Sequence, residues 1–166
     1  MSKMKLLPYK VNEVSRETKI VSYGVKMIRA DKFWAKSNRG KGITVAIIDT
    51  GCDVDHKALK NNIAHTRNFT KDDNSNKDIA NDYVGHGTHV AGIVLSVAPE
   101  CSLMILKALN GDGEGEYKWI INAINYATSK KVDVISMSLG GYIDDENLHK
   151  AIRKAASNNI LVVCAA

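Results

Sequence analysis

The sequence predicts an α/β fold: a doubly wound, mainly parallel sheet with helices on both faces. Apolar, β-branched runs of strand length alternate along the chain with segments of helical period. The apolar runs are continuous, as expected for strands that are buried on both faces. An alternation of this kind returns each strand parallel to the previous one through a crossover helix. At 166 residues, with 45% hydrophobic and 25% charged residues, the chain can build one domain core.

Helices and strands are expected to alternate as follows. The helices are expected at residues 30–36, 88–97, 116–129 and 145–157. The strands are expected at residues 43–48, 103–109, 134–138 and 160–165, so the fold would be truncated after about the fourth or fifth strand. In the first helix, Phe33 and Trp34 are expected to face the interior.

The N-terminal residues carry a weaker pattern. Residues 1–20 are polar and irregular except for the apolar group Leu6-Leu7-Pro8-Tyr9. We therefore expect an extension, residues 1–19, lying on the surface of a domain formed by residues 20–166.

Charge and composition argue against several classes of partner. The net charge is +5, but lysine and arginine are scattered among acidic residues, and no basic run interleaves with aromatics. No nucleic-acid partner is therefore expected. No apolar stretch approaches the length of a membrane span or a signal peptide, so we expect no membrane contact and a cytoplasmic location. Cys52, Cys101 and Cys164 are odd in number and adjoin apolar stretches, which predicts buried, reduced thiols.

The candidate chemistry lies in two short motifs. Asp49-Thr50-Gly51 follows a predicted strand, and Gly85-His86-Gly87-Thr88-His89 opens a predicted helix. A buried carboxylate that accepts a hydrogen bond from an imidazole fixes the tautomer of the ring, so that the ring can act as a general base. We expect Asp49 and His86 to form such a pair. The positive end of the helix is expected to disfavour protonation of His86.

A metal hydrolase is an alternative interpretation of the same motifs. Asp49, His86 and His89 are possible ligands, but no further ligand stands at a characteristic spacing.

Further motifs occur in a recognisable order after these two. They are Asp49-Thr50-Gly51-Cys52-Asp53, residues 85–92, Val97-Ala98-Pro99-Glu100, residues 117–122, residues 135–141 and Val162-Val163-Cys164-Ala165-Ala166. On these motifs the chain resembles the N-terminal part of a subtilase, a subtilisin-like serine protease. Within that family it is most similar to the intracellular subtilisins of Bacillus-type bacteria.

The resemblance implies a serine endopeptidase that acts on polypeptide substrates, with Asp49 orienting His86 and His86 acting as the general base. Gly113-Glu114-Gly115 would pair with the substrate backbone as an added strand, and Ser138-Leu139-Gly140 would form one wall of a substrate pocket. Glu114 and Glu116 on that edge suggest a preference for basic substrate positions.

The N-terminal apolar group is also implied to have a role. Leu6-Leu7-Pro8-Tyr9 is similar to the segment of intracellular subtilisins that lies across the active site and keeps the enzyme inactive. The chain's own N-terminal segment would then be an internal partner. The full-length family also makes a homodimer an expected possibility.

The chain departs from the family pattern in two respects. A shortened loop before Val97, and Lys57-Ala58 in place of the family's carboxylate, predict that the family's calcium site is lost, so no metal and no cofactor are expected. No serine lies in a Gly-x-Ser-x-Gly elbow, and the family's oxyanion Asn is also absent. The 166 residues alone are therefore expected to be inactive. The alternative is a pseudoprotease or a fragment that binds peptides without cleaving them.

Overall fold

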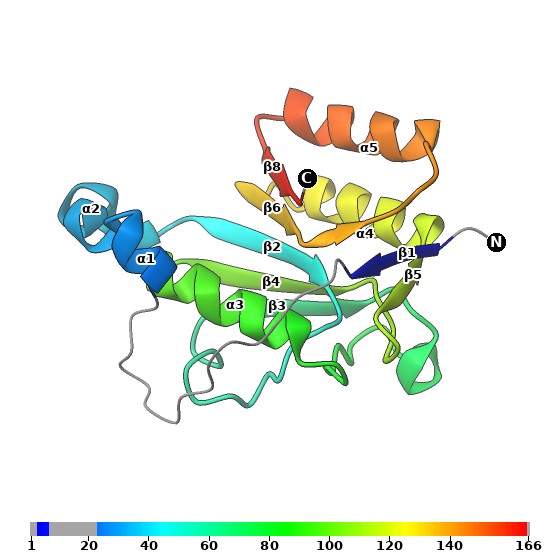
Figure 1. Cartoon of the computed structure of the whole chain (residues 1–166), viewed down its shortest axis with the longest axis horizontal. Coiled ribbons are helices and arrows are strands. Elements are labelled where there is room, and N and C mark those ends of the chain that lie inside the picture. The colour runs from blue at the N-terminus through cyan, green and yellow to red at the C-terminus, as the bar shows by residue number, and fades with distance from the viewer. Residues whose placement is uncertain (1–2, 7–22, 166) are drawn as a thin grey trace.

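A five-stranded parallel sheet forms the centre of the computed structural model, which describes residues 3–6 and 23–165 (Figure 1). Its strand order is β3-β4-β2-β6-β8, and every neighbouring pair is parallel. The strands are β2 (Thr44–Asp49), β3 (Ile63–Asn68), β4 (Ser102–Lys107), β6 (Val134–Met137) and β8 (Leu161–Cys164). The predicted α/β class is confirmed.

The helices cover both faces of this sheet. They are α1 (Tyr23–Met27), α2 (Ala30–Ser37), α3 (His86–Val97), α4 (Tyr117–Ser129) and α5 (Glu146–Ser157), with short 3-10 helices η1 (Asn38–Gly40) and η2 (Asp72–Ser75). Ala46 and Ile48 of β2 point into the apolar core formed with α4 and α5, whereas Val45 and Ile47 point into the core formed with α3. This alternation explains why the β2 sequence is apolar throughout.

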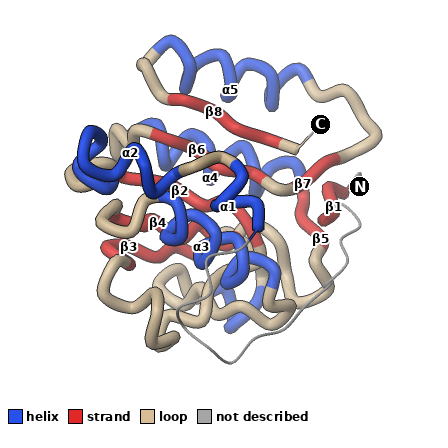
Figure 2. The backbone as a smooth tube through the Cα atoms, turned by 60° about the vertical axis from the view of Figure 1, so that its left-hand side comes forward, coloured by secondary structure: helices blue, strands red, loops and turns tan. Residues whose placement is uncertain are grey.

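A second, antiparallel sheet lies beside the first, with the strand order β5-β1-β7 (Figure 2). Its strands are β1 (Lys3–Leu6), β5 (Glu114–Glu116) and β7 (Leu139–Gly140). Within the expected N-terminal extension, residues 3–6 are not irregular, because they form β1, the central strand of this sheet. Leu7, Pro8 and Tyr9 lie outside the described residues.

Three further expectations need correction. The strand β3 was not predicted, because it lies at one edge of the sheet and its half-buried side chains include polar ones. Phe33 is 59% exposed, since only Ala30 of the short helix α2 is buried. Trp34, about 100° further round the helix, donates its indole N–H to the Val97 carbonyl at 2.8 Å. Cys164 is exposed on β8, whereas Cys52 and Cys101 are buried, and all three are free thiols.

No described helix is both long and apolar enough to cross a membrane.

Candidate active site

The candidate site lies at the carboxyl ends of the central strands. β4 and β6 flank β2 on opposite sides, although both follow it in sequence, so the strand order reverses at β2. In open parallel sheets such a reversal leaves a crevice beyond the strand ends, where ligands bind. Asp49 is the last residue of β2 and therefore faces this crevice.

The structure brings Asp49 and His86 into contact. His86 Nδ1 lies 2.7 Å from Asp49 Oδ1, and the two residues are 8% and 1% exposed. An ionised carboxylate can only accept hydrogen bonds, so Nδ1–H donates and Nε2 carries the lone pair of the neutral ring. This is the tautomer that a general base at Nε2 requires.

The environment favours the protonated form of His86. The hydrogen bond to Asp49 raises the pKa of His86 above its ordinary value; burial opposes this, and the charges of Asp49 and Asp82 add to it. The other oxygen of Asp49, Oδ2, is buried without a hydrogen-bond donor among the described residues, which leaves its negative charge close to the ring. The expected depression of the His86 pKa by the helix end is therefore wrong, because the carboxylate outweighs it.

Asp82 organises the start of the histidine helix. Its Oδ1 accepts from the Thr50 hydroxyl at 2.8 Å and from the backbone N–H groups of Val84 at 3.0 Å and Gly85 at 2.8 Å. Its Oδ2 accepts from the N–H and the hydroxyl of Thr88, at 2.9 and 2.6 Å. Burial opposes ionisation, but these donors together lower the pKa of Asp82. Sequence reasoning missed this residue, although a carboxylate just before a helix start is a recognisable capping signal.

A close backbone approach fixes the distance between the two motifs. A Cβ atom at Gly87 would collide with the carbonyl oxygen of Gly51, so only glycine fits there. Thr50 completes the junction: its hydroxyl accepts from the Gly87 N–H at 3.0 Å, and its own N–H donates to Asp49 Oδ1 at 2.7 Å. Gly87 thus allows the helix to pack directly onto the end of β2.

A fully buried lysine supports the same strand end from β4. Lys107 Nζ donates to the Thr50 carbonyl at 2.7 Å and lies 3.1 Å from Asp72 Oδ2. Its ammonium group is also 5.2 Å from the ring centroid of Tyr83. Lys107 therefore joins the carboxyl ends of β2 and β4 to η2. Sequence analysis did not identify it, because a lysine at a strand end ordinarily faces solvent.

The residues expected to bind substrate lie on either side of β1. We call the position between β5 and β7, which β1 fills, the groove. Met4 lies opposite Gly115 and Lys5 opposite Glu114, all in antiparallel register. On the other side, Lys5 pairs with Gly140 and Leu6 with Leu139. Gly113 accepts a hydrogen bond from the Leu6 N–H at 3.2 Å. Ser138 is half-buried and directly precedes β7.

The turn before β5 is built by a side chain that sequence analysis did not single out. Asn110 Oδ1 accepts from the N–H groups of Asp112 and Glu114, both at 3.0 Å. Gly113, in the left-handed conformation with φ of 73°, closes the turn. The Asn-Gly-Asp-Gly sequence at 110–113 was an available signal, since asparagine and glycine favour such turns.

One side chain of β1 is buried in the apolar core and forms part of the wall of a cavity. Met4 is 5% exposed and lines a cavity of about 320 Å³. The apolar part of the cavity wall is formed by Tyr117, Ile120, Met137, Leu139, Leu148 and Ile152. The Tyr117 hydroxyl donates to the Ile143 carbonyl at 2.9 Å and holds the 141–145 segment over the cavity. The apolar cluster beside the cavity thus accommodates the long, unbranched side chain of Met4.

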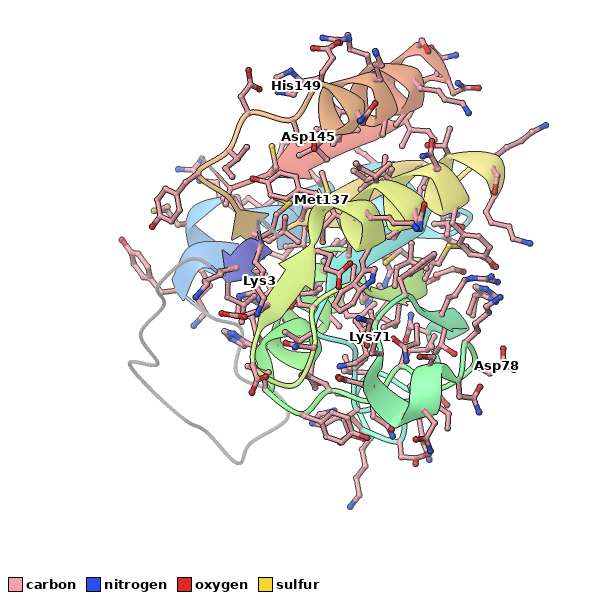
Figure 3. All side chains as sticks on the ribbon, turned by 90° about the vertical axis from the view of Figure 1, so that its right-hand side faces the viewer. Lys3, Lys71, Asp78, Met137, Asp145 and His149 are labelled. Carbon is pink, nitrogen blue, oxygen red and sulfur yellow. The ribbon has the colours of Figure 1, made fainter. Side chains whose placement is uncertain are left out.

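The two lysines of β1 converge on one carboxylate. Lys3 Nζ lies 2.5 Å from Glu114 Oε2, and Lys5 Nζ lies 2.6 Å from Glu114 Oε1. Figure 3 shows Lys3 on β1 beside β5. Glu116, which we had also associated with basic substrates, instead lies 3.7 Å from Lys71.

The described residues do not fit the alternative metal chemistry. His89 is exposed and lines a cavity with His56, Ala58 and Ser96, whose lining includes neither Asp49 nor His86. The Ala58 N–H donates to His56 Nδ1 at 3.2 Å, and neither side chain offers the oxygen ligands that calcium requires. In residues 3–6 and 23–165 no three His, Cys, Asp or Glu side chains form a metal-binding cluster.

The buried thiol nearest the aspartate is not suited to act as a nucleophile. Cys52, three residues after Asp49, is buried, and this burial raises the pKa of its thiol to about 12. A thiol with such a pKa is almost fully protonated near neutral pH, and the thiolate is the reactive form.

Known proteins resemble this chain over most of its length. A family model described as the subtilase family matches residues 40–166. The chain belongs to the subtilase family. It is 49% identical to the major intracellular serine protease of Bacillus subtilis (strain 168), over 98% of this chain and 54% of that protein. It is 48% identical to the intracellular serine protease of Paenibacillus polymyxa, over 99% of this chain and 53% of that protein.

A relative with a different name matches over less of this subtilase. Subtilisin DY of Bacillus licheniformis is 41% identical over 88% of this chain and 54% of that protein. The chain thus spans about half the length of the curated relatives it matches.

Proposed function

We propose that these residues form the part of a serine endopeptidase that carries the general base and the groove for the substrate backbone. The observation that carries this proposal is the buried contact between His86 Nδ1 and Asp49 Oδ1 at 2.7 Å, at the carboxyl end of β2. Family membership and relatives named as serine proteases support it.

The mechanism follows from the tautomer. Asp49 holds His86 with its proton on Nδ1, so Nε2 can take the proton of a serine hydroxyl as that oxygen attacks the peptide carbonyl. The imidazolium formed in this step is stabilised by Asp49, in line with the raised pKa of His86. The same imidazolium then protonates the leaving amine, and water hydrolyses the acyl-enzyme.

The nucleophile is the part of the proposal that these residues do not supply. None of the serines of the 166-residue sequence stands in a Gly-x-Ser-x-Gly elbow, and no Gly-Thr-Ser turn is present. We therefore propose that the 166 residues bind peptides but do not hydrolyse them without a serine from additional sequence.

We also propose that β1 keeps the groove closed. It lies between β5 and β7 as an added strand would, and Leu6-Leu7-Pro8-Tyr9 continues from it. In the proline, the missing N–H and the fixed φ are unfavourable for a well-aligned scissile bond. We propose a cytoplasmic location, because two of the relatives are named intracellular and the three cysteines are free. Homodimerisation of a longer protein remains part of this proposal.

A chimeric enzyme tests the proposal. The 166 residues are joined to the part of the Bacillus subtilis relative that the match leaves uncovered, and hydrolysis of denatured casein is measured. We expect activity from the chimera, none from the 166 residues alone, and more activity when residues 1–19 are removed. His86→Ala should lower kcat on the order of 10⁶-fold and Asp49→Asn about 10⁴-fold, magnitudes known for subtilisin and related triads themselves.

His89→Ala serves as the matched control, because His89 is an exposed histidine on the same helix. A folded chimera whose activity survives His86→Ala would reject the assignment of His86 as the base. Peptide binding without hydrolysis in the folded chimera would favour the second candidate function, a non-catalytic peptide-binding module, which the occupied groove between β5 and β7 also supports.

A further inference from the structure

The residue pattern of β1 matches the chemistry of the groove that holds it. We propose that Glu114 is a specificity residue of this groove, which favours extended peptides with a lysine on each side of the buried residue because Glu114 recognises both lysines. This proposal rests on the proposed function, because it takes β1 to occupy the place of a substrate strand.

The antiparallel register places the apolar side chain of Met4 and the two lysines of β1 on opposite faces of the strand. Successive side chains of a strand point to opposite faces. Met4, opposite Gly115, packs into the buried apolar cluster, and Lys3 and Lys5 therefore share the other face. A peptide in the same register would place one residue against this cluster and its two neighbours beside Glu114.

Glu114 is arranged to hold two cations at once. Its Oε2 lies 2.5 Å from Lys3 and its Oε1 lies 2.6 Å from Lys5, so each carboxylate oxygen has its own ammonium group. Lys5 is directly across the strand pair and Lys3 is diagonal to it, and both positions are within reach of a long side chain. One lysine would leave one of these oxygens without its cation.

The backbone of Glu114 is fixed independently of β1. Its N–H donates to Asn110 Oδ1 at 3.0 Å, and its carbonyl accepts from the Asn110 N–H at 2.8 Å. The carboxylate is therefore expected to stay at the groove edge when β1 leaves. Glu116, two residues further along the same strand, lies opposite Lys3 but has its ion pair, at 3.7 Å, with Lys71, so it is the comparison carboxylate without a short contact to β1.

The surroundings of Met4 select the central residue by shape and polarity. Gly141 keeps space for Met4 and Tyr117, because a Cβ there would collide with the Tyr117 hydroxyl and lie 3.3 Å from Met4 Cγ. A Cβ at Gly115 would instead lie 2.8 Å from Leu109 Cδ2. The wall beneath is mainly apolar, with the carboxylates of Asp144 and Asp145 at one side. An aspartate between the two lysines would have to bury its charge there, which is unfavourable.

The first experiment measures occupancy of the groove by β1 in the full 166-residue chain. The readout is hydrogen exchange of the Leu6 N–H, which donates to the Gly113 carbonyl. Combined Lys3→Glu and Lys5→Glu should increase this exchange at least several-fold by placing like charges beside Glu114. Adding Glu114→Lys should restore slow exchange. Unchanged exchange in the first variant, or no restoration in the second, would overturn the role of Glu114.

The second experiment measures selectivity in the Lys3→Glu, Lys5→Glu chain, in which β1 competes less strongly for the groove, with peptides titrated to millimolar concentration. The probes are the acetylated, amidated peptides Lys-Met-Lys-Leu, Gln-Met-Gln-Leu and Lys-Asp-Lys-Leu, titrated while the NMR signal of the Gly115 amide is followed. We expect the first peptide to bind about three- to tenfold more tightly than the second, as two cross-strand charge pairs allow, and the third to bind least. Glu114→Gln should remove the difference between the first two peptides, whereas Glu116→Gln should preserve it.

Equal affinity for the lysine and glutamine peptides, or a lysine preference that survives Glu114→Gln, would refute the proposal. These results are separable from the protease assay because binding needs no serine. Lysine selectivity in a folded chimera that does not cleave would leave the specificity standing and reject the protease function. Cleavage without lysine selectivity would support the protease function and reject the lysine specificity.

Discussion

At the scale of single residues, Asp49 determines how His86 titrates. The hydrogen bond from His86 to this carboxylate raises the histidine pKa despite burial of the ring. We expect Asp49→Asn to lower the pKa of His86, because the amide can accept the hydrogen bond but carries no charge. NMR titration of the His86 ring measures this directly, and His89→Gln serves as a control that leaves the His86 pKa unchanged.

The same pair links stability to pH with a definite sign. The folded pKa of His86 is raised, so the stability that its protonation contributes is fully present below the unfolded pKa of about 6.5 and is lost as the pH rises through the folded value. Urea midpoints of the parent chain should therefore fall across this window more than those of Asp49→Asn. Parallel pH profiles of the two proteins would contradict the linkage.

Asp82 should give the opposite pH dependence. Its pKa is lowered: burial opposes ionisation, but hydrogen bonds from Thr88, Gly85 and Thr50 outweigh it. The stability from this carboxylate is thus present above the unfolded pKa of about 3.9 and is lost as the pH falls through the lower folded value. We expect Asp82→Asn to lower the free energy of unfolding by about 2 kcal/mol at neutral pH, because the NH2 that replaces Oδ2 cannot accept the hydrogen bonds from the N–H and hydroxyl of Thr88.

Urea denaturation at several pH values measures the effect of Asp82→Asn. The exposed Asp78, whose side chain is labelled in Figure 3, offers a matched control as Asp78→Asn, which should change little. Equal stability of the two variants at neutral pH would argue against Asp82 as the organiser of the helix start.

At the scale of elements, β5 tolerates no side chain opposite Met4. A Cβ at Gly115 would collide with the Ala108 carbonyl and lie 2.8 Å from Leu109 Cδ2. We expect Gly115→Ala to shift β5, to lower the free energy of unfolding by about 1–3 kcal/mol, and to weaken the pairing with β1. Thermal denaturation and hydrogen exchange of the Met4 amide measure the two effects. Gly92→Ala on α3, where an added Cβ meets no atom within 4 Å, is the control.

Elements that bury a continuous apolar face could be predicted from the sequence. This holds for β2 and β4, whose runs of apolar side chains meet helices on both faces. It fails for β1, which alternates lysine with apolar residues over only four positions and gains its strand conformation from two partners distant in sequence. It fails equally for β3, because an edge strand does not need a continuous apolar run.

Only some residues of the candidate site could be predicted from the sequence. Asp49 and His86 stand in motifs that are typical of a carboxylate paired with a general base, one after a strand and one at a helix start, so their contact could be predicted. Asp82 and Lys107 act through the folded geometry alone: one collects donors from a loop and a helix, and the other reaches across from β4. The sign of the His86 pKa shift also needed the structure, since it depends on the balance between a helix end and a carboxylate in contact.

At the scale of the whole molecule, β8 leaves one apolar face exposed. Leu161 and Val163 are 61% and 49% exposed, and β8 pairs only with β6 among the described residues. We expect the 166-residue chain to self-associate with rising concentration, and Leu161→Lys with Val163→Lys to suppress this association. Sedimentation velocity over a concentration series measures it. Identical monomeric profiles for both proteins would show that this face does not drive association.

The position of β1 also sets how tightly a free peptide must bind to enter the groove. Because β1 belongs to the same polypeptide as β5 and β7, it competes at an effective local concentration that for tethered segments reaches about millimolar. A free peptide present at micromolar levels must therefore bind roughly a thousandfold more tightly than the tethered strand to replace it. Because of the tether, weakly binding or dilute peptides do not displace β1. Peptides bind in the groove only when they are concentrated or when the chain between β1 and the rest of the domain is cut.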